Sequence, residues 1–160
     1  MRIVLARDVG ALLKSKGLTI SVAESCTGGK LGDQLTDVSG SSDYFMGGVI
    51  SYSNRAKVEL LGVNAGTLAK RGAVNDVVAK QMASGVRRSL HTDIGVSITG
   101  IAGPSGGSAE KPVGLVYIAV SSTKGTVCVK STFKGSRSQV KAQSVSKTLK
   151  MVKDFVSSKY

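Results

Sequence analysis

The residues best suited to chemistry in this chain lie in the stretch "ESCTGG", residues 24–29, where Ser25 and Cys26 stand side by side before two glycines. A strand that runs into glycines and then into a helix directs backbone N–H groups outward at the positive end of that helix. Such a terminus suits an anion or a developing oxyanion. The stretch has neither the spacing of a Walker A loop nor that of a G-x-S-x-G nucleophile elbow. Its composition alone fits a functional loop and a plain strand-to-helix turn equally well.

A serine attacks poorly without a base, and the stretch "SYSNRAK", residues 51–57, offers one in Lys57. A desolvated lysine loses its proton more easily, and Ser–Lys pairs are a known variant of nucleophilic catalysis. Tyr52 stands at the end of a predicted strand, where it could relay a proton or orient the amine. Two alternatives stay open: Lys57 is a solvated helix lysine with Tyr52 in the core, or its partner is Ser53, which shares its helix face.

Cys26 is the alternative nucleophile, but the chain has a single histidine, His91, to activate it. His91 follows a predicted helix, where a surface or capping role is the simpler interpretation. A small cysteine packed behind the loop is likewise the simpler interpretation of Cys26. With Cys128 the chain has two cysteines, too few for a disulfide framework. No cluster has the spacing of a zinc site, so we expect neither a metal nor a cofactor.

A third candidate region is the loop "TGIAGPSGGSAEKPVG", residues 99–114, which contains five glycines and two prolines. Glycine lets the backbone approach a ligand closely, and a long ordered loop is more often functional than not. The loop also offers the hydroxyls of Thr99, Ser105 and Ser108, with Lys111 nearby. These features suit the binding of a phosphate or a ribose.

The elements that must position these residues alternate between helices and strands. Hydrophobic periodicity and turn residues predict helices over 2–16, 28–37, 53–62, 65–72, 75–91 and 136–157, and strands over 19–25, 44–52, 93–100, 113–122 and 126–135. Asn75 and Ser136 are the expected caps of the last two helices. Two glycines inside 44–52 indicate a bulge or a close backbone approach. Residues 38–43 and 101–112 are expected to be loops.

The last two predicted strands are joined by the turn "TKG" and are expected to form a hairpin, which argues against an all-parallel sheet. We therefore predict an α/β fold, a three-layer α/β/α sandwich with a mixed sheet, as a single domain over residues 1–160. Ligands in such folds bind where loops leave the carboxyl ends of the strands. Residues 24–29, 51–57 and 99–108 all occupy such positions.

The chain carries a formal net charge of +12, with its basic residues spread along its length. A basic chain can bind nucleic acid or an anionic small molecule, although 4% aromatic residues provide no stacking platform for single strands. The N-terminal stretch lacks the pattern of a signal peptide, and its apolar residues, Ile3, Val4, Leu5, Val9, Leu12 and Leu13, fit one face of a helix. No apolar run reaches the length of a membrane span. We expect a cytoplasmic protein with reduced thiols.

Three stretches taken together, "AESCTGG", "GGVISYSNRAKVELLGV" and "ITGIAGPSGGSAEKPVG", resemble the CinA C-terminal domain family, also called the nicotinamide-nucleotide amidase family. The segments "LTDVSGSS", "GAVNDVVAKQMA" and "FKGSRSQVKAQSV" extend the resemblance over nearly the whole chain. The resemblance implies deamidation of nicotinamide mononucleotide to nicotinate mononucleotide and ammonia, in pyridine-nucleotide salvage. Carried onto this sequence, it makes Ser25 the nucleophile, Lys57 the general base and Tyr52 its helper.

The resemblance also implies an oxyanion site at the N–H groups of Thr27 and Gly28, and an anionic pyridine nucleotide as the binding partner. The substrate-binding residues that it implies are Gly48, Thr99, Gly100, Gly103, Ser105 and Arg137. A homo-oligomer is expected by analogy. Asn75 stands where the family commonly has serine, and because asparagine also caps helices well, the helix entry should survive. The alternative hypothesis is a non-catalytic nucleotide- or nucleic-acid-binding module linked to competence, suggested by the positive charge.

Overall fold

Five strands form one mixed sheet at the centre of the structure, a computed structural model that describes residues 2–160. The strands are β1 (Ile20–Glu24), β2 (Phe45–Ile50), β3 (Ile94–Gly100), β4 (Leu115–Ser122) and β5 (Gly125–Thr132), and their order across the sheet is β2-β1-β3-β4-β5. β1 pairs in parallel with both β2 and β3, whereas β4 runs antiparallel to β3 and β5. The predicted mixed sheet is confirmed, and so is the hairpin, whose turn consists of Thr123 and Lys124.

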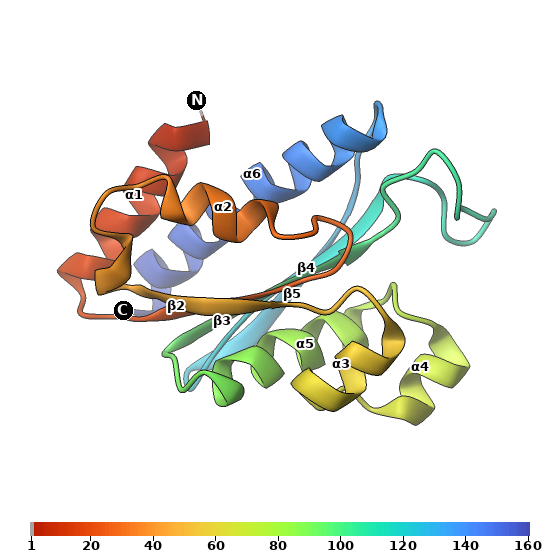
Figure 1. The fold of residues 1–160 in the computed structure, drawn as a ribbon, viewed down its shortest axis with the longest axis horizontal. Coiled ribbons are helices and arrows are strands. Elements are labelled where there is room, and N and C mark those ends of the chain that lie inside the picture. Colours follow the sequence, from red (N-terminus) through yellow and green to blue (C-terminus); the bar gives the residue numbers. More distant parts are fainter. Residues whose placement is uncertain (1) are drawn as a thin grey trace.

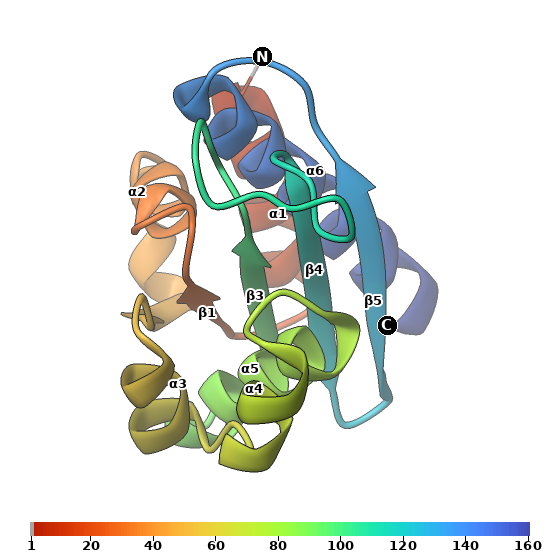
Figure 2. The same ribbon diagram turned by 90° about the vertical axis from the view of Figure 1, so that its right-hand side faces the viewer.

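Helices cover both faces of this sheet. On one face lie α1 (Arg2–Ser15), α2 (Lys30–Thr36) and α6 (Arg137–Lys159), and on the other α5 (Asp76–Ser89) packs on the strands and carries α3 (Asn54–Leu61) and α4 (Ala65–Arg71) (Figures 1 and 2). A short 3-10 helix, Ser41–Asp43, lies in the predicted 38–43 loop. The predicted three-layer α/β/α sandwich is therefore confirmed.

The central strands β1 and β3 are buried, except for Gly100 at the end of β3, because helices cover them on both sides. The buried side of α1 is made by Ala6, Val9 and Leu13, which recur every three to four residues. The predicted apolar face of this helix included Ile3 and Val4, but these side chains are 44% and 54% exposed. They lie on the first turn of α1, which rises away from the sheet (Figure 1). That part of the prediction was wrong.

Two glycines set where α2 begins. The sequence predicted a helix from residue 28, but Gly28 and Gly29 have φ angles of 61° and 100°, which belong to the left-handed region and cannot continue an α-helix. The helix therefore begins at Lys30. Since β1 ends at Glu24, Ser25 lies neither on the strand nor on the helix but on the tight turn between them.

The glycines of β2 confirm both expectations that the sequence raised for them. The register against β1 shifts between Ile20 and Ser21, so Met46 is bulged out of the pairing. A Cβ on Gly48 would lie 2.8 Å from the carbonyl oxygen of Val22, which means that only glycine allows the two backbones to come this close. In residues 2–160, no helix is both long enough and apolar enough to cross a membrane.

Candidate active site

The carboxyl ends of β1, β2 and β3 bring the three candidate regions to one edge of the sheet. They surround a pocket of about 280 Å³. Its lining includes Ser25, Tyr52, Lys57, Thr99, Gly100, Gly103, Ser105 and Arg137. The loop after β3 lies beside the start of α6, which explains how Arg137, distant in sequence, reaches the pocket (Figure 2). The parallel strands therefore place all three regions where a ligand can contact them together.

Ser25 and Lys57 are in direct contact inside this pocket. The Lys57 Nζ atom lies 3.1 Å from Ser25 Oγ and donates a second hydrogen bond of 2.7 Å to the carbonyl oxygen of Ser51. The Lys57 side chain is among the largest fully buried ones, with 1% of its surface exposed, so it is not a solvated helix lysine. The rival partner, Ser53, caps α3 instead, because its Oγ accepts the N–H of Ala56 at 3.0 Å.

The surroundings of Lys57 favour its neutral form. Burial removes water from the ammonium group and lowers the pKa of Lys57 below the ordinary lysine value. Among residues 2–160, none of the ion pairs involves this lysine, so no carboxylate opposes the effect of burial. A neutral amine 3.1 Å from a hydroxyl has the geometry of a general base beside its nucleophile.

The neighbouring Cys26 has the opposite character. It is 7% exposed, and burial raises the pKa of its thiol to about 11, so the thiolate that would attack is scarce at neutral pH. His91 cannot activate either residue, because it is exposed in the turn before β3, at the edge of the sheet opposite to Ser25. Within the described residues no group of three or more histidines, cysteines or carboxylates could hold a metal ion.

Glu24 is a site residue that the sequence reasoning missed. Its buried carboxylate accepts the backbone N–H groups of Gly29, Leu31 and Gly32 at 3.2, 3.1 and 2.9 Å. The carboxylate therefore occupies the positive end of α2, so the expectation that this helix end suits an oxyanion is wrong. The sequence did contain a signal for this role: Glu24 ends a strand that was predicted to be buried, and a buried glutamate requires hydrogen-bond partners.

The turn after Ser25 is closed by its own backbone. The N–H of Gly28 donates to the carbonyl oxygen of Ser25 at 3.1 Å, and neither Thr27 nor Gly28 lines the pocket. Thr27 is buried, and its Oγ1 has no hydrogen-bond partner among the described residues. The predicted oxyanion residues thus follow Ser25 in the turn without lining the pocket, and the N–H of Gly28 already has an acceptor.

Tyr52 and Arg137 meet at the rim of the pocket. The Arg137 guanidinium donates to the Gly103 carbonyl oxygen at 2.9 Å and to the Tyr52 hydroxyl at 3.2 Å. Tyr52 is 63% exposed, and its recorded partner is Arg137 rather than Lys57. The lysine is oriented by the Ser51 carbonyl, a backbone group that sequence reasoning has no means of selecting.

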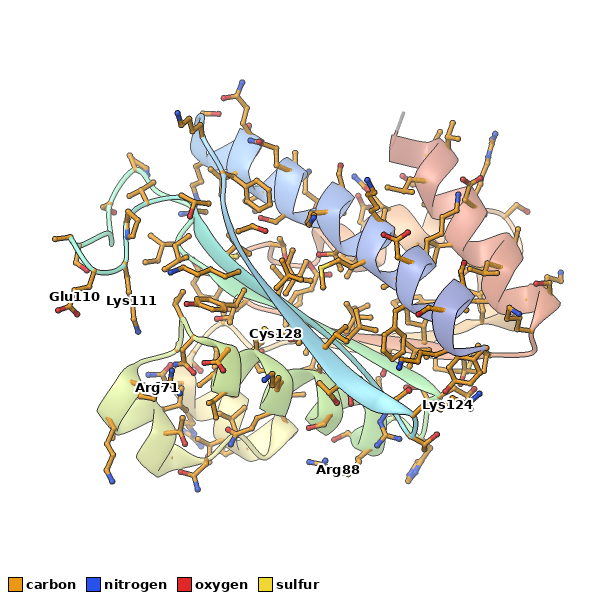
Figure 3. All side chains as sticks on the ribbon, turned by 180° about the vertical axis from the view of Figure 1, so that it is seen from behind. Arg71, Arg88, Glu110, Lys111, Lys124 and Cys128 are labelled. Atoms are coloured by element: carbon orange, nitrogen blue, oxygen red, sulfur yellow. The ribbon has the colours of Figure 1, made fainter. Side chains whose placement is uncertain are left out.

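The remaining predicted binding residues divide between the pocket and other parts of the fold. Thr99 lines the pocket, with its hydroxyl donating to the Ala73 carbonyl oxygen at 2.9 Å. Gly48 does not reach the pocket, because it packs against β1. Lys111 extends from its loop toward α4 and donates a hydrogen bond to the carbonyl oxygen of Arg71 (Figure 3). Its amine therefore connects the loop to α4 and does not line the pocket.

Changing Glu24 to glutamine tests its part in holding the turn that carries Ser25. One amide –NH₂ would face backbone donors that now meet a carboxylate oxygen, so we expect the free energy of unfolding to fall by about 2 kcal/mol. Urea denaturation measures this change. The control is Glu59→Gln, which breaks an exposed ion pair with Arg55 and should change stability by less than about 0.5 kcal/mol. Equal effects of the two changes would contradict a structural role for Glu24.

Sequence comparisons place these features in a known family. A family model described as the CinA C-terminal domain matches residues 3–156. A CinA-like protein of Rippkaea orientalis is 60% identical over 123 residues, covering 77% of this chain and 30% of that protein. A putative competence-damage inducible protein of Halothermothrix orenii is 54% identical over 136 residues, covering 84% of this chain and 33% of that protein. The chain spans about a third of the length of these relatives.

Solved structures agree with the sequence comparisons. A CinA superfamily protein from Klebsiella pneumoniae has a TM-score of 0.95 and 30% identity, covering 99% of both chains. A competence/damage inducible protein from Agrobacterium tumefaciens has a TM-score of 0.94 and 38% identity, covering 98% of this chain and 95% of that one. The family match over nearly the whole length, together with this structural likeness, shows that the chain belongs to the CinA C-terminal domain family.

Proposed function

We propose that this protein is an amidase that converts nicotinamide mononucleotide to nicotinate mononucleotide and ammonia. The observation that carries the proposal is the contact of 3.1 Å between Lys57 Nζ and Ser25 Oγ, made by a buried lysine at the base of an open pocket. A serine paired with a desolvated amine is an arrangement for attack on a carbonyl carbon. The choice of substrate follows the family resemblance of the three loops that form the pocket.

The acylation half-reaction uses the two side chains in sequence. The neutral amine of Lys57 accepts the hydroxyl proton of Ser25 while Oγ forms a bond to the amide carbon, and the carbonyl electrons move to oxygen. When the tetrahedral intermediate collapses, the carbonyl re-forms and the C–N bond breaks. Lys57 returns its proton to the departing nitrogen, which leaves as ammonia.

Deacylation repeats the same proton transfers with water. Lys57 accepts a proton from a water molecule as its oxygen attacks the acyl carbon, and the proton passes to Ser25 Oγ as the ester bond breaks. The carboxylic acid product leaves and the dyad returns to its starting state. Because the two side chains are already in contact, the proton transfer requires no relay through Tyr52.

The oxyanion of the intermediate needs donors close to Ser25. The N–H groups of Cys26 and Thr27 have no recorded acceptor among the described residues, whereas that of Gly28 is bonded to Ser25. We assign the oxyanion to the N–H of Cys26, because Cys26 lines the pocket and Thr27 does not, so this assignment replaces both predicted residues, Thr27 and Gly28. Tyr52, Arg137 and the 99–106 segment then contact the rest of the nucleotide from the rim.

Ammonia release by the purified protein tests this function. We expect equal molar amounts of ammonia and nicotinate mononucleotide from nicotinamide mononucleotide, measured by a coupled ammonia assay and by chromatography. Mass spectrometry of the quenched enzyme should detect the acyl group on the peptide that contains Ser25. Absence of ammonia, combined with DNA binding that weakens steeply with salt, would instead favour the binding-module hypothesis.

A further inference from the structure

We infer that Arg137 and Lys141, one turn apart at the start of α6, form a two-cation subsite that binds the phosphate monoester of the substrate. This inference rests on the proposed function and deepens it, because it says which side of Ser25 receives the charged end of the nucleotide. Arg137 lines the pocket, and Lys141 follows it at i+4, the spacing that places two side chains on the same helix face.

Lys141 lies over the turn that carries the nucleophile. A methyl group placed on Gly28 would lie 3.7 Å from Lys141 Nζ, so the amine stands beside the Ser25–Gly28 turn. Burial raises the pKa of the Cys26 thiol, and the charge of Lys141 partly opposes that rise, in agreement with this closeness. The side chain is half-buried, and within residues 2–160 it has no recorded hydrogen bond. Its donors therefore remain available to a ligand.

Arg137 is held in place and still has donors to offer. Its two recorded hydrogen bonds go to the Gly103 carbonyl and the Tyr52 hydroxyl. A guanidinium carries five N–H groups, so about three of them remain free. A guanidinium fixed by two neutral acceptors keeps its whole charge and presents the planar fork that suits phosphate oxygens.

No carboxylate of the described residues neutralises this pair. In the described part of the chain, neither cation takes part in an ion pair and no acidic residue lines the pocket. Glu24, the buried acid nearest to Ser25 in the chain, is already bonded to the N–H groups of α2. The pocket therefore has an excess of positive charge on the α6 side, and a phosphate dianion would balance it.

The position of Arg137 in the first turn opposes the stability of α6. Basic residues are unfavourable near the positive end of a helix, and the first turn of α6 contains no acid to compensate. The helix is capped without them, because Ser136 and Gln139 form a capping box. Helix stability therefore gives no reason for Arg137 to be here, whereas an anionic ligand does.

The test compares two substrates that carry the same amide, nicotinamide mononucleotide and its phosphate-free nucleoside, nicotinamide riboside. Lys141→Gln should raise KM for the nucleotide about tenfold, as expected for loss of a hydrogen bond between charged groups. Its kcat should change less than about threefold, and its KM for the riboside should stay the same. Lys141→Arg should restore most of the affinity. The Tm of Lys141→Gln should match that of the wild type, because within residues 2–160 the amine makes no hydrogen bond or ion pair that the change would remove.

Lys150→Gln is the matched control, because it removes the same charge from an exposed position nine residues, or about 13 Å, further along the same helix. Its KM for the nucleotide should match that of the wild type. The inference is overturned if Lys141→Gln affects both substrates equally, leaves KM for the nucleotide unchanged, or behaves like Lys150→Gln.

A binding measurement separates failure of the subsite from failure of the proposed function. Inorganic phosphate, compared with chloride at equal ionic strength, should raise the Tm of the wild type and leave that of Lys141→Gln unchanged. If neither substrate releases ammonia but this difference persists, the amidase proposal fails and the anion subsite stands. If phosphate stabilises both proteins equally, the subsite is wrong whatever the activity.

Discussion

Ser25→Ala is expected to lower the rate of ammonia release from nicotinamide mononucleotide by at least about 10⁴-fold, because it removes the proposed nucleophile and with it the proposed covalent pathway. The fold should be retained. Ser25 is small and lies on a turn held by backbone bonds and by Glu24, and the Lys57 amine keeps its bond to the Ser51 carbonyl. We expect the free energy of unfolding to change by less than about 1 kcal/mol. Steady-state kinetics and urea denaturation provide the two measurements.

Ser53→Asn is the control for this experiment. Ser53 shares the helix face of Lys57 and was the rival hydroxyl in the sequence, but its side chain caps α3. Asparagine preserves the cap and removes the hydroxyl, so activity should stay within about twofold of the wild type. The nucleophile is misassigned if Ser25→Ala keeps more than a tenth of the activity, or if its acyl-enzyme peptide still forms.

Lys57→Met should lower kcat/KM by a factor of about 10² to 10⁴, the usual contribution of a general base. In the wild type, kcat/KM should rise with pH as the free amine appears, with a midpoint below the ordinary lysine pKa because burial lowers the pKa of Lys57. The variant has no amine to titrate, so this rise should vanish from its pH profile. Stopped assays across the alkaline range measure both profiles.

The same pKa shift predicts how stability depends on pH. Because the pKa of Lys57 is lower in the folded state, the unfolded chain binds more protons between the folded and unfolded pKa values. The contribution of Lys57 to the free energy of unfolding should therefore rise with pH across that interval and be constant below it. Lys57→Met should lose this rise, which chemical denaturation at several pH values would detect.

Lys70→Met supplies the matched control, since it makes the same change at an exposed position of α4. Its pH profiles of activity and stability should follow those of the wild type. The general-base assignment would be untenable if Lys57→Met retained the alkaline rise in kcat/KM. It would also fail if Lys70→Met lost that rise, because the effect would then belong to overall charge.

Most of the fold was predictable because local sequence signals, such as the residues that cap helices, mark where the elements begin. Asn75 caps α5 through a bond of 2.9 Å to the N–H of Val78, as its type and position predicted, so the departure from the family's serine leaves the helix entry intact. Ser136 likewise caps α6 within a capping box. The errors fell where backbone angles override side-chain patterns, as at Gly28 and Gly29, which delay the start of α2.

The candidate site was predictable to the level of residue types and loop positions. The predicted strand ends indicated the loops in which Ser25 and Lys57 lie. In the structure, the parallel pairing of β1 with β2 and β3 brings these two residues together. The sequence could not select the Ser51 carbonyl, because every residue has one. Nor could the sequence show which residue Tyr52 contacts. Its hydroxyl accepts a hydrogen bond from Arg137, which lies 85 residues later in the chain, at the start of α6.

By itself, then, the sequence determined the elements, their caps and the glycine positions, since these depend on local propensity. The rule that strand ends share an edge offered Lys57 as a partner for Ser25, but it left Ser53 and a solvated lysine open as alternatives. The tertiary structure alone decided which groups are available. It buried Lys57 so that its amine can be neutral, and it turned Glu24 back onto the start of α2. Within residues 2–160 it also left Arg137 and Lys141 without an ion pair to an acid. Burial, hydrogen-bond partners and unbalanced charge arise only from contacts between segments far apart in the chain, so no local pattern can encode them.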